Sequence, residues 1–477
     1  MPDTPTSPSP SPSPQQNPAA THVDVVSDVT VWSRDRWLPA RDVHLRDGLV
    51  HALTPHGAVP PAAGATVLHG DGGHLVPGLV NTHTHLHQAA LRGIGEGEPL
   101  LSWLRLVGEE TVALTPERAY AAAAAAASEA LRSGTTTLVE HMWPHPSPEV
   151  HDAVLRALTD TGIRAVVCRG VADRPDPTRR WGFDPRLMQP LEEALAHTGH
   201  LAAAVRGSRL SVGVAVPNVR TLTPAGMRTV RAFADEHGLP VSLHLLETTT
   251  DDDMCRARLG RGAVAHLDEN GFLWDRLLAV HCVELDAAGQ ALLARRGVAV
   301  SYNPLSNMRL GSGIAPVPAM LAAGLDVGVG VDGAASNDTQ DMLEALRVGA
   351  YLQRAAHRRA DLLDFTAMMR LGVDGASAAL GLPRRPDGVV PGVPADLVLH
   401  RFARDYATLP VRDPGATLLT CASSRTVDTV LVAGEPVVRD GRSTRLPESR
   451  LVAALLESAP PAARAARTAT GGAVTVS

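Results

Sequence analysis

Histidines and carboxylates stand where several apolar runs of this chain end. His83 and His85 follow LVPGLVN with one residue between them, and His244, His281 and Asp332 follow later runs. Alternate residues of a strand share one face, so both rings of an HxH pair can point toward the same ion. Neutral imidazole nitrogens and carboxylate oxygens are ligands that zinc-like ions take. Three histidines and an aspartate from this set therefore predict a hydrolytic site for one divalent metal ion.

Each of these residues also has a simpler interpretation. An HxH pair alone is weak evidence, because solvated or core histidines can produce it. His281 could be a ligand, a group behind the ligands or a packed core histidine. Asp332 precedes a glycine and could be a turn residue. Their shared position at the ends of apolar runs favours the metal site.

Glu247 lies three residues after His244, in the segment HLLE. A metal ion lowers the pKa of a bound water to about 7, and a nearby base must then move its proton. A glutamate at a helix start, favoured by the helix dipole, is the alternative. We predict that Glu247 transfers protons during catalysis.

All 44 basic residues are arginine, and the chain contains no lysine. A P-loop lysine, a Schiff-base lysine and a carboxylated lysine that bridges two metal ions are therefore excluded. The net charge is −6 with no basic cluster, so nucleic-acid binding is not expected. A small-molecule partner is expected instead.

The four cysteines are scattered, without a CxxC pair, as expected for reduced thiols of a cytoplasmic protein. The N-terminus lacks the charged and apolar regions of a secretory signal, and no apolar run has the length of a membrane span. We therefore predict a cytoplasmic location without membrane contact.

Eight β-branched or apolar runs alternate with alanine-rich helical stretches, which is typical of parallel βα units. The expected strands are LVPGLVNTH, TTTLVEH, RAVVCRG, LSVGVAV, PVSLHLLE, LLAVHCV, GVAVSYNP and DVGVGVDG. Eight units without a glycine-rich dinucleotide turn predict an α/β fold with a closed (β/α)8 TIM-like barrel. The candidate ligands would then come from the C-terminal ends of strands one, five, six and eight, where barrel enzymes build their sites.

Short antiparallel strands are expected at both ends of the chain, and these should join in one small β-sandwich. The predicted domains are a disordered Pro/Ser tail at 1–22, sandwich parts at 23–75 and 385–445, the barrel at 76–384, and a C-terminal helix and tail at 446–477. The repeated SPSPSPSP of the tail cannot bury enough apolar surface to order.

Segments along residues 23–445 resemble the amidohydrolase superfamily, in its cytosine-deaminase-like and triazine-hydrolase-like branch, which includes S-adenosylhomocysteine/methylthioadenosine deaminases and 8-oxoguanine deaminases. The segments are PGLVNTHTHLHQAALRG, SGTTTLVEH, HLLET, AVHCVELD, NPLSNMRLGSGIAPVPAMLAAG, VGVDGAASND and PADLVLH, in the order of that branch. The piece around NPLSNMRLGSGIAPV is the longest and most specific.

This resemblance implies one zinc ion, sometimes iron, held by His83, His85, His244 and Asp332. It implies that His281 contacts the activated water or the substrate. Glu247 would protonate a ring nitrogen and pass the proton to departing ammonia, while Asp332 activates the water from the other side. The implied reaction is hydrolytic deamination through a tetrahedral intermediate.

The resemblance also implies substrate contacts. Trp103 resembles an aromatic that packs on the substrate, Ser336 a residue near the bound ring, and Arg169 an arginine that can reach a neighbouring subunit. The alternatives are core packing for Trp103, a helix N-cap for Ser336 and a surface ion pair for Arg169. The Arg169 match makes a homodimer or larger homo-oligomer the expected assembly.

Two departures from the family pattern concern the substrate. Asn218, after Pro217, and Tyr302, in Ser301-Tyr302-Asn303-Pro304, stand where many members carry histidine, so both are candidate substrate-binding residues. A standard adenosine-type substrate is therefore in question. The loop VADRPDPTRRWGFDPRL could hinge at Gly182, between Trp181 and Phe183, and its Arg179 or Arg180 could bind a carboxylate or diol.

Together these features predict a metal-dependent aminohydrolase acting on a small nitrogen heterocycle, with purine-type bases or nucleosides first. Two alternatives stay open. The first is hydrolysis of chloride or alkylamine from a triazine-like ring, or of a cyclic amidine or amide. The second is a non-enzymatic binding protein on a retired barrel, which would predict losses among the ligands or at Glu247.

Overall fold

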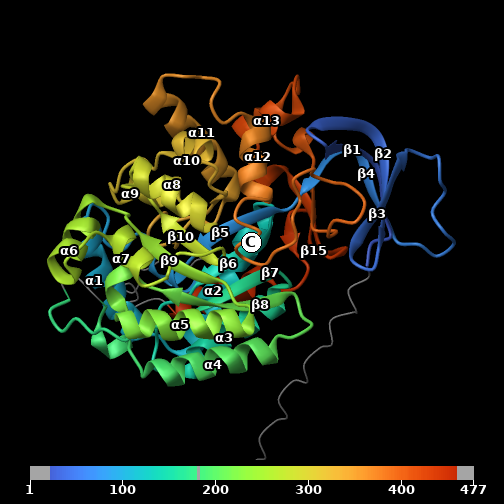
Figure 1. Cartoon of the computed structure of the whole chain (residues 1–477). Helices are drawn as coiled ribbons and strands as arrows, with labels where there is room; N and C mark the ends of the chain where they lie inside the picture. Colours follow the sequence, from blue (N-terminus) through green and yellow to red (C-terminus); the bar gives the residue numbers. More distant parts are fainter. Residues whose placement is uncertain (1–21, 180–182, 459–477) are drawn as a thin grey trace, which may run out of the picture.

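The computed structural model describes residues 22–179 and 183–458 (Figure 1). The predicted Pro/Ser tail, apart from its last residue, lies outside the described residues, as do positions 459–477 of the predicted C-terminal segment. The proposed hinge at Gly182, with Trp181 and Arg180, also lies outside them.

Each of the eight predicted runs forms a strand of one parallel sheet, in sequential order around the centre of the molecule (Figure 1). The strands are β5 (Leu79–Thr84), β6 (Thr135–His141), β7 (Arg164–Gly170), β8 (Leu210–Val216), β9 (Val241–Leu245), β10 (Leu277–His281), β11 (Ala299–Tyr302) and β12 (Val327–Val329). The Asp332 N–H donates to the His83 carbonyl oxygen over 2.9 Å, which joins the last strand segment to the first. The predicted TIM-like barrel is confirmed, and two candidate metal ligands lie at its closure.

Helices surround these strands, with α3, α4 and α5 along one side and α8, α10 and α11 on another (Figure 1). Their bounds are α1 (Leu100–Val112), α2 (Pro116–Arg132), α3 (Pro148–Thr161), α4 (Leu191–Ala204), α5 (Pro224–His237), α6 (Thr249–Leu259), α7 (Ala263–Glu269), α8 (Ala287–Arg296), α9 (Pro304–Arg309), α10 (Val317–Ala322), α11 (Met342–His357), α12 (Phe365–Val373), α13 (Pro414–Thr420) and α14 (Glu448–Ser458). None of the helices within the described ranges combines the length and apolar character of a membrane span.

Helix α2 shows why alanine-rich segments suit this position. Its first turn is capped by the Thr115 hydroxyl, which accepts from the Arg118 N–H, and Pro116 stands at the first helical position. The run Ala121–Ala127 is buried on every side of the helix. Alanine has the highest helix propensity and the small side chain lets α3 and α14 pack closely against α2.

The two ends of the chain meet in a second sheet, as predicted. Its strands are β1 (Val25–Ser33), β2 (Arg36–Arg46), β3 (Leu49–Pro55), β4 (Val67–Pro77), β13 (Leu397–His400), β14 (Val427–Val432), β15 (Glu435–Arg439) and β16 (Arg442–Ser443). They form one continuous hydrogen-bonded sheet in which β4 pairs antiparallel with β13, placing Leu75 opposite Leu399. Its valine- and leucine-rich core includes residues from both ends of the chain.

The second sheet also anchors the first barrel strand. Strand β4 ends at Pro77, and β5 begins at Leu79, so the chain passes directly from one sheet into the other. The Gly78 N–H between them donates to the Asp396 carbonyl oxygen over 2.8 Å. This short, bonded connection fixes the strand that carries the HxH pair.

Candidate active site at the strand ends

The candidate ligands lie at the C-terminal ends of barrel strands one, five, six and eight. His83 is in β5 and His85 follows its end, His244 is in β9, His281 is the last residue of β10, and Asp332 follows β12. His281 and Asp332 have positive φ angles of 74° and 64°. Such backbone angles cost energy in residues other than glycine, and they persist at functional sites because the surrounding structure holds them.

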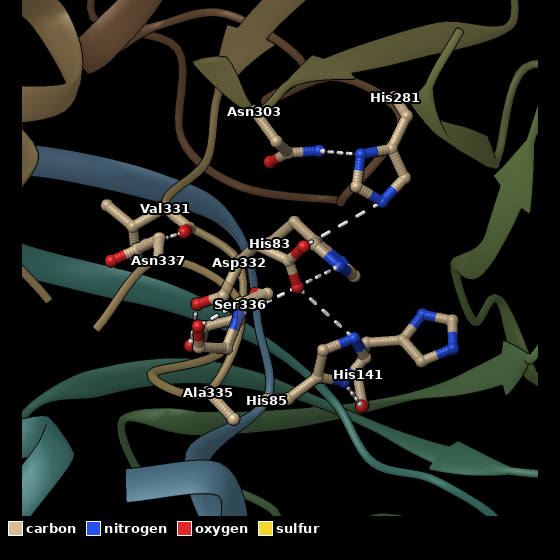
Figure 2. A network of polar contacts seen from close by, with 12 residues as sticks. His83, His85, His141, His281, Asn303, Val331, Asp332, Ala335, Ser336 and Asn337 are labelled. Atoms are coloured by element: carbon tan, nitrogen blue, oxygen red, sulfur yellow. Dashed lines mark hydrogen bonds and ion pairs between the residues drawn. The ribbon is translucent and has the colours of Figure 1, made fainter. Parts of the chain in front are cut away.

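The side chains of these residues converge in the barrel mouth. Two sets of ligand atoms lie within 4.8 Å of one another: His83 with His244 and His281, and His83 with His85 and Asp332. Asp332 Oδ1 is 3.3 Å from His83 Nε2 and 3.4 Å from His85 Nε2 (Figure 2). His281 lies farther away, with its Nε2 3.9 Å from Asp332 Oδ2.

The imidazoles are in the state that binds metal ions. Burial lowers the pKa of His83 to about 4 and also lowers the pKa of His85 and His244, so the rings are neutral. His85 Nδ1 donates to the His141 carbonyl oxygen over 2.6 Å, which leaves the Nε2 lone pair directed toward Asp332. Among the described residues, Nδ1 of His244 and Nδ1 of His83 have no hydrogen-bond partner, although both atoms are buried.

Asp332 completes a donor set that fits a divalent cation. Burial opposes its ionisation, but hydrogen bonding to His83 and the proximity of the other rings hold its pKa well below its usual range. Among the described residues, its recorded ion pairs are all with histidines. An ionised, buried carboxylate among neutral imidazoles lacks a full counter-charge, and a divalent metal ion would supply one.

The glycines around Asp332 let its backbone approach a crowded centre. A Cβ at Gly330 would lie 2.3 Å from Asn303 Oδ1, and one at Gly333 would lie 1.8 Å from Gln88 Oε1. Neither separation is tolerated between non-bonded atoms. Glycine at these two positions, one on each side of Asp332, therefore leaves the space that the Asn303 and Gln88 side chains occupy.

Glu247 lies beside the candidate ligands and is only 7% exposed. Burial, together with the charges of Asp332 and Asp251, raises its pKa well above its usual value, against a hydrogen bond from Ser312. The Ser312 hydroxyl donates to Glu247 Oε1 over 3.2 Å, and Glu247 Oε2 is 3.7 Å from His281 Nε2. These surroundings favour the protonated form of Glu247, which faces the same cavity.

One cavity joins these groups to an apolar wall. Its lining includes His85, His244, Glu247, His281 and Asp332 at one end. The wall contains three large aromatic residues, which are Trp103, Trp143 and Phe183, together with leucines of α1. Trp143 and Phe183 meet edge to face, with ring centroids 5.2 Å apart. The cavity is suited to a flat, largely apolar ring held over a polar reaction centre.

Two of the five predicted substrate-binding residues line this cavity. Trp103 is 3% exposed, and its indole N–H donates to the Ala335 carbonyl oxygen over 3.1 Å, which fixes the ring. Asn218 also lines the cavity, but its side-chain oxygen accepts from the Arg220 N–H over 2.9 Å and so caps a short 3-10 helix, Val219–Thr221.

The other three predicted residues are not part of the lining. Tyr302 alternates with Ser301 on β11, so Ser301 faces the barrel interior while the Tyr302 hydroxyl bonds to Gly349 and Gln353 of α11. Its predicted contact with substrate is therefore not supported by its position. Comparison with family members that carry histidine here identified the position of Tyr302 in the chain. It did not indicate toward which face of the strand the side chain points.

Arg169 and Ser336 are bonded within this chain. Arg169 is fully buried, donates to the Gly170 carbonyl oxygen and to Gln189 Oε1, and does not point to a surface. The Ser336 hydroxyl donates to the Gly333 carbonyl oxygen over 2.8 Å in the turn after Asp332 (Figure 2). Ser336 thus stabilises the turn after Asp332 and is not part of the cavity lining.

The structure adds cavity residues that sequence reasoning missed. Trp143 lies two residues after the end of β6, and its place past a barrel strand could have indicated it. Arg220 lines the cavity and donates to Asp251 Oδ1 over 3.0 Å, a pairing between the 3-10 helix after β8 and helix α6 that no local pattern indicates. Arg179 reaches the cavity as well, but Glu109 and Asp184 already pair with it.

Comparison with known proteins agrees with this geometry. A model of the amidohydrolase family matches residues 74–437. The chain belongs to the amidohydrolase family. It is therefore a hydrolase that acts on carbon–nitrogen bonds other than peptide bonds, as predicted.

Two relatives of this amidohydrolase are named as deaminases. A 5-methylthioadenosine/S-adenosylhomocysteine deaminase of Desulforudis audaxviator is 34% identical over 413 residues, covering 86% of this chain and 92% of the relative. A 5'-deoxyadenosine deaminase of Methanopyrus kandleri is 33% identical over 383 residues, covering 79% and 84%.

Solved structures share the fold over nearly the whole chain. An adenosine deaminase from Xanthomonas campestris with bound zinc superposes with a TM-score of 0.82 at 29% identity, over 92% of this chain and 98% of that one. An atrazine chlorohydrolase from Arthrobacter aurescens in complex with zinc superposes with a TM-score of 0.84, over 91% and 100%. At 24% identity the second likeness shows the fold alone.

Proposed function

We propose that this amidohydrolase removes the amino group of an adenine-type nucleoside by hydrolysis, with 5'-modified adenosines as the first candidates. The observation that carries the proposal is the position of Glu247, whose pKa is raised, beside a buried His and Asp donor set and a wall of aromatic residues. The names of the relatives, which are adenosine-type deaminases, support this substrate class.

The proposed metal ligands are His83, His85, His244 and Asp332, and zinc is the proposed ion, with iron as the alternative. Their neutral nitrogens and ionised oxygen fit zinc, and the zinc in the Xanthomonas campestris relative's name agrees with this choice. When bound, the ion would make a water nucleophilic at neutral pH and stabilise negative charge.

Glu247 would act first as a general acid. Its raised pKa keeps the carboxyl protonated, so it can donate a proton to the ring nitrogen next to the amino-bearing carbon. Addition of water to that carbon then gives a tetrahedral intermediate, and Asp332 takes up the proton that the water loses. Glu247, now a carboxylate, takes the proton of the new hydroxyl group and passes it to the amino group, so the carbon–nitrogen bond breaks, ammonia leaves and a ring carbonyl forms. The proton held by Asp332 then returns Glu247 to its acid form.

His281 would donate a hydrogen bond to oxygen at the reacting carbon. Its Nε2 faces the space between Glu247 Oε2 and Asp332 Oδ2, at 3.7 and 3.9 Å. The aromatic wall, with Trp103 fixed by its bond to Ala335, would pack on the flat ring. Asn218 is the second proposed substrate contact, since it lines the same cavity.

No described residue favours the alternatives. Hydrolysis of chloride or alkylamine from a triazine-like ring would use the same groups, but the likeness to the chlorohydrolase concerns the fold alone. A binding protein on a retired barrel predicts missing ligands, whereas the complete donor set and Glu247 lie together in the barrel mouth.

Three further properties are proposed with this function. The partner is a small heterocyclic molecule, without nucleic acid or membrane contact, which suits the enclosed cavity. The location is the cytoplasm, which suits four free cysteines, three of them buried. A homodimer or larger assembly is also proposed; Arg169, at which the resemblance suggested it, is buried within this chain, so sedimentation of the purified protein is the test.

Ammonia release tests the function directly. Zinc-loaded protein is offered adenosine, 5'-deoxyadenosine, 5'-methylthioadenosine and S-adenosylhomocysteine, with guanine, 8-oxoguanine, cytosine and a triazine as comparisons. We expect release from at least one adenosine, and a fall of about 100-fold or more in kcat for Glu247→Gln at unchanged zinc content. Release only from another ring, or activity independent of Glu247, would refute the proposal.

A further inference from the structure

Two amide groups converge on the far side of the His281 ring. Asn307 Nδ2 lies 3.0 Å from His281 Nδ1. Asn303 Nδ2 lies 3.5 Å from the same nitrogen (Figure 2). Asn303 is the N-cap of helix α9 and Asn307 lies within that helix, in the segment NPLSN that stood out in the sequence without an assigned role. Neither residue lines the substrate cavity.

The orientation of the Asn303 amide is set by its neighbours. Its Nδ2 donates to the Ser301 carbonyl oxygen over 3.2 Å, and its Oδ1 accepts from the Ser301 hydroxyl over 3.2 Å. The second hydrogen of this NH2 group is therefore the one that faces His281 Nδ1. A donor aimed at Nδ1 requires a lone pair on that nitrogen.

Asn307 is held in place by the same turn of helix. It is 1% exposed, and its N–H donates to the Asn303 carbonyl oxygen over 3.1 Å. Turning its amide over would direct Oδ1 at His281 Nδ1 and would require a hydrogen on that ring nitrogen. The Asn303 amide opposes this arrangement, because its NH2 group would then face an N–H.

We propose that Asn307, supported by Asn303, is a positioning residue that keeps His281 in the Nε2–H tautomer. A neutral imidazole carries one N–H, so an accepting Nδ1 places the hydrogen on Nε2. His281 then donates into the cavity and is not a metal ligand, although its nitrogen lies within reach of His83 and His244. His85 is the opposite case, because its Nδ1 donates to a carbonyl and its Nε2 is left bare.

The catalytic consequence of this tautomer rests on the proposed function, whereas the tautomer itself does not. The first measurement is therefore the 15N NMR spectrum of histidine-labelled, zinc-loaded protein, with His281 assigned by its absence in His281→Gln. We expect a protonated-type Nε2 and an unprotonated-type Nδ1. An unprotonated Nε2 in the wild type overturns the proposal, whatever the enzyme's substrate.

The near-isosteric Asn307→Asp variant tests the cause. A carboxylate accepts a hydrogen bond, so it should draw the hydrogen to Nδ1 and reverse the two nitrogen signals. We expect kcat to fall by about 100-fold, as for removal of one donor to a developing oxyanion, with KM within a few-fold. Unchanged nitrogen signals together with unchanged kcat would contradict the role of Asn307.

Two further variants distinguish this positioning role from a general loss of structure. Asn270→Asp adds the same charge at the end of α7, where Asn270 Nδ2 bonds to the His266 carbonyl oxygen, and should leave spectrum and kcat unchanged. Asn307→Ser keeps a hydroxyl donor and serves if the aspartate variant does not fold. If the wild type deaminates no nucleoside, the proposed function fails, and the nitrogen signals still decide the tautomer.

Discussion

At the two sides of the barrel mouth, similar side chains have opposite hydrogen-bonding environments. Around β5 and β12, His85 is backed by a carbonyl oxygen, and Asp332 is surrounded by neutral rings, so bare nitrogens and an ionised carboxylate face inward. At the end of β10 and in the turn after β9, His281 is backed by amide NH2 groups, and burial and acidic neighbours raise the pKa of Glu247. His244, within β9 itself, belongs with the proposed metal ligands.

This contrast shows how one set of residue types supplies two functions. The first side offers lone pairs, which suit a metal ion, and the second offers hydrogens, which suit proton transfer to a substrate. The difference comes from the group behind each side chain. We call these the ligand side and the proton side.

The largest effect is expected from replacing a proposed metal ligand on the ligand side. Asp332→Asn replaces the carboxylate with an amide that binds metal weakly and cannot accept the proton of water. We expect zinc affinity to fall by at least about 100-fold and kcat by about 1000-fold or more. Metal analysis after dialysis and ammonia release measure both. Full zinc content with normal turnover would show that the two sides are not distinct.

The next largest effect is on the pH dependence of stability, and it comes from Glu140, a buried acid near the ligand side. Glu140 in β6 accepts only from the Leu86 N–H among its recorded bonds, and burial raises its pKa to about 8. Between its unfolded pKa near 4.5 and this value, the folded state keeps a proton that the unfolded state loses. Stability therefore decreases as pH rises through this window.

Replacing this acid should remove that dependence. We expect the wild type to lose roughly 3 kcal/mol of unfolding free energy between about pH 5 and pH 8, and Glu140→Gln to lose much less. Urea unfolding at several pH values measures the difference. Because Glu140 does not line the cavity, kcat should change little, and a large loss of kcat would assign it to the reaction instead.

The smallest effect is expected on the proton side, from removing the hydrogen bond that Glu247 accepts. The Ser312 hydroxyl donates to Glu247 and lowers its pKa, so Ser312→Ala should raise that pKa further. Activity that needs protonated Glu247 declines as pH rises through its pKa, and this decline should move to higher pH in the variant. We expect a kcat change of a few-fold, since one neutral hydrogen bond contributes about 1 kcal/mol. A pH–rate profile that moves to lower pH would contradict this arrangement.

Much of the fold followed from local patterns. The eight apolar runs each became a barrel strand, because alternation with helical stretches allows few other topologies. The meeting of the two chain ends in one sheet also agreed, since both ends carried short strands. The segments 1–21 and 459–477 and the loop at 180–182 lie outside the described residues.

The substrate cavity could not be predicted to the same degree. Tyr302 stood at the expected position but faces α11, because a short strand shows each side chain to only one side. Trp143, Arg220 and Ser312 reach the site from segments that connect the strands, and the paths of these segments depend on packing with distant parts of the chain. The spacing of residues in the sequence does not predict such contacts.

The sequence by itself determined which residues stand at the strand ends, and therefore which atoms a metal ion could meet. Alternation along a strand and the one-sided mouth of a barrel are local and topological rules, so they can be read from order and spacing. Only the tertiary structure decided which nitrogen of each ring is bare and which carboxyl keeps its proton. Those states depend on burial and on hydrogen-bond partners many residues away, such as Asn307 for His281 and Ser312 for Glu247.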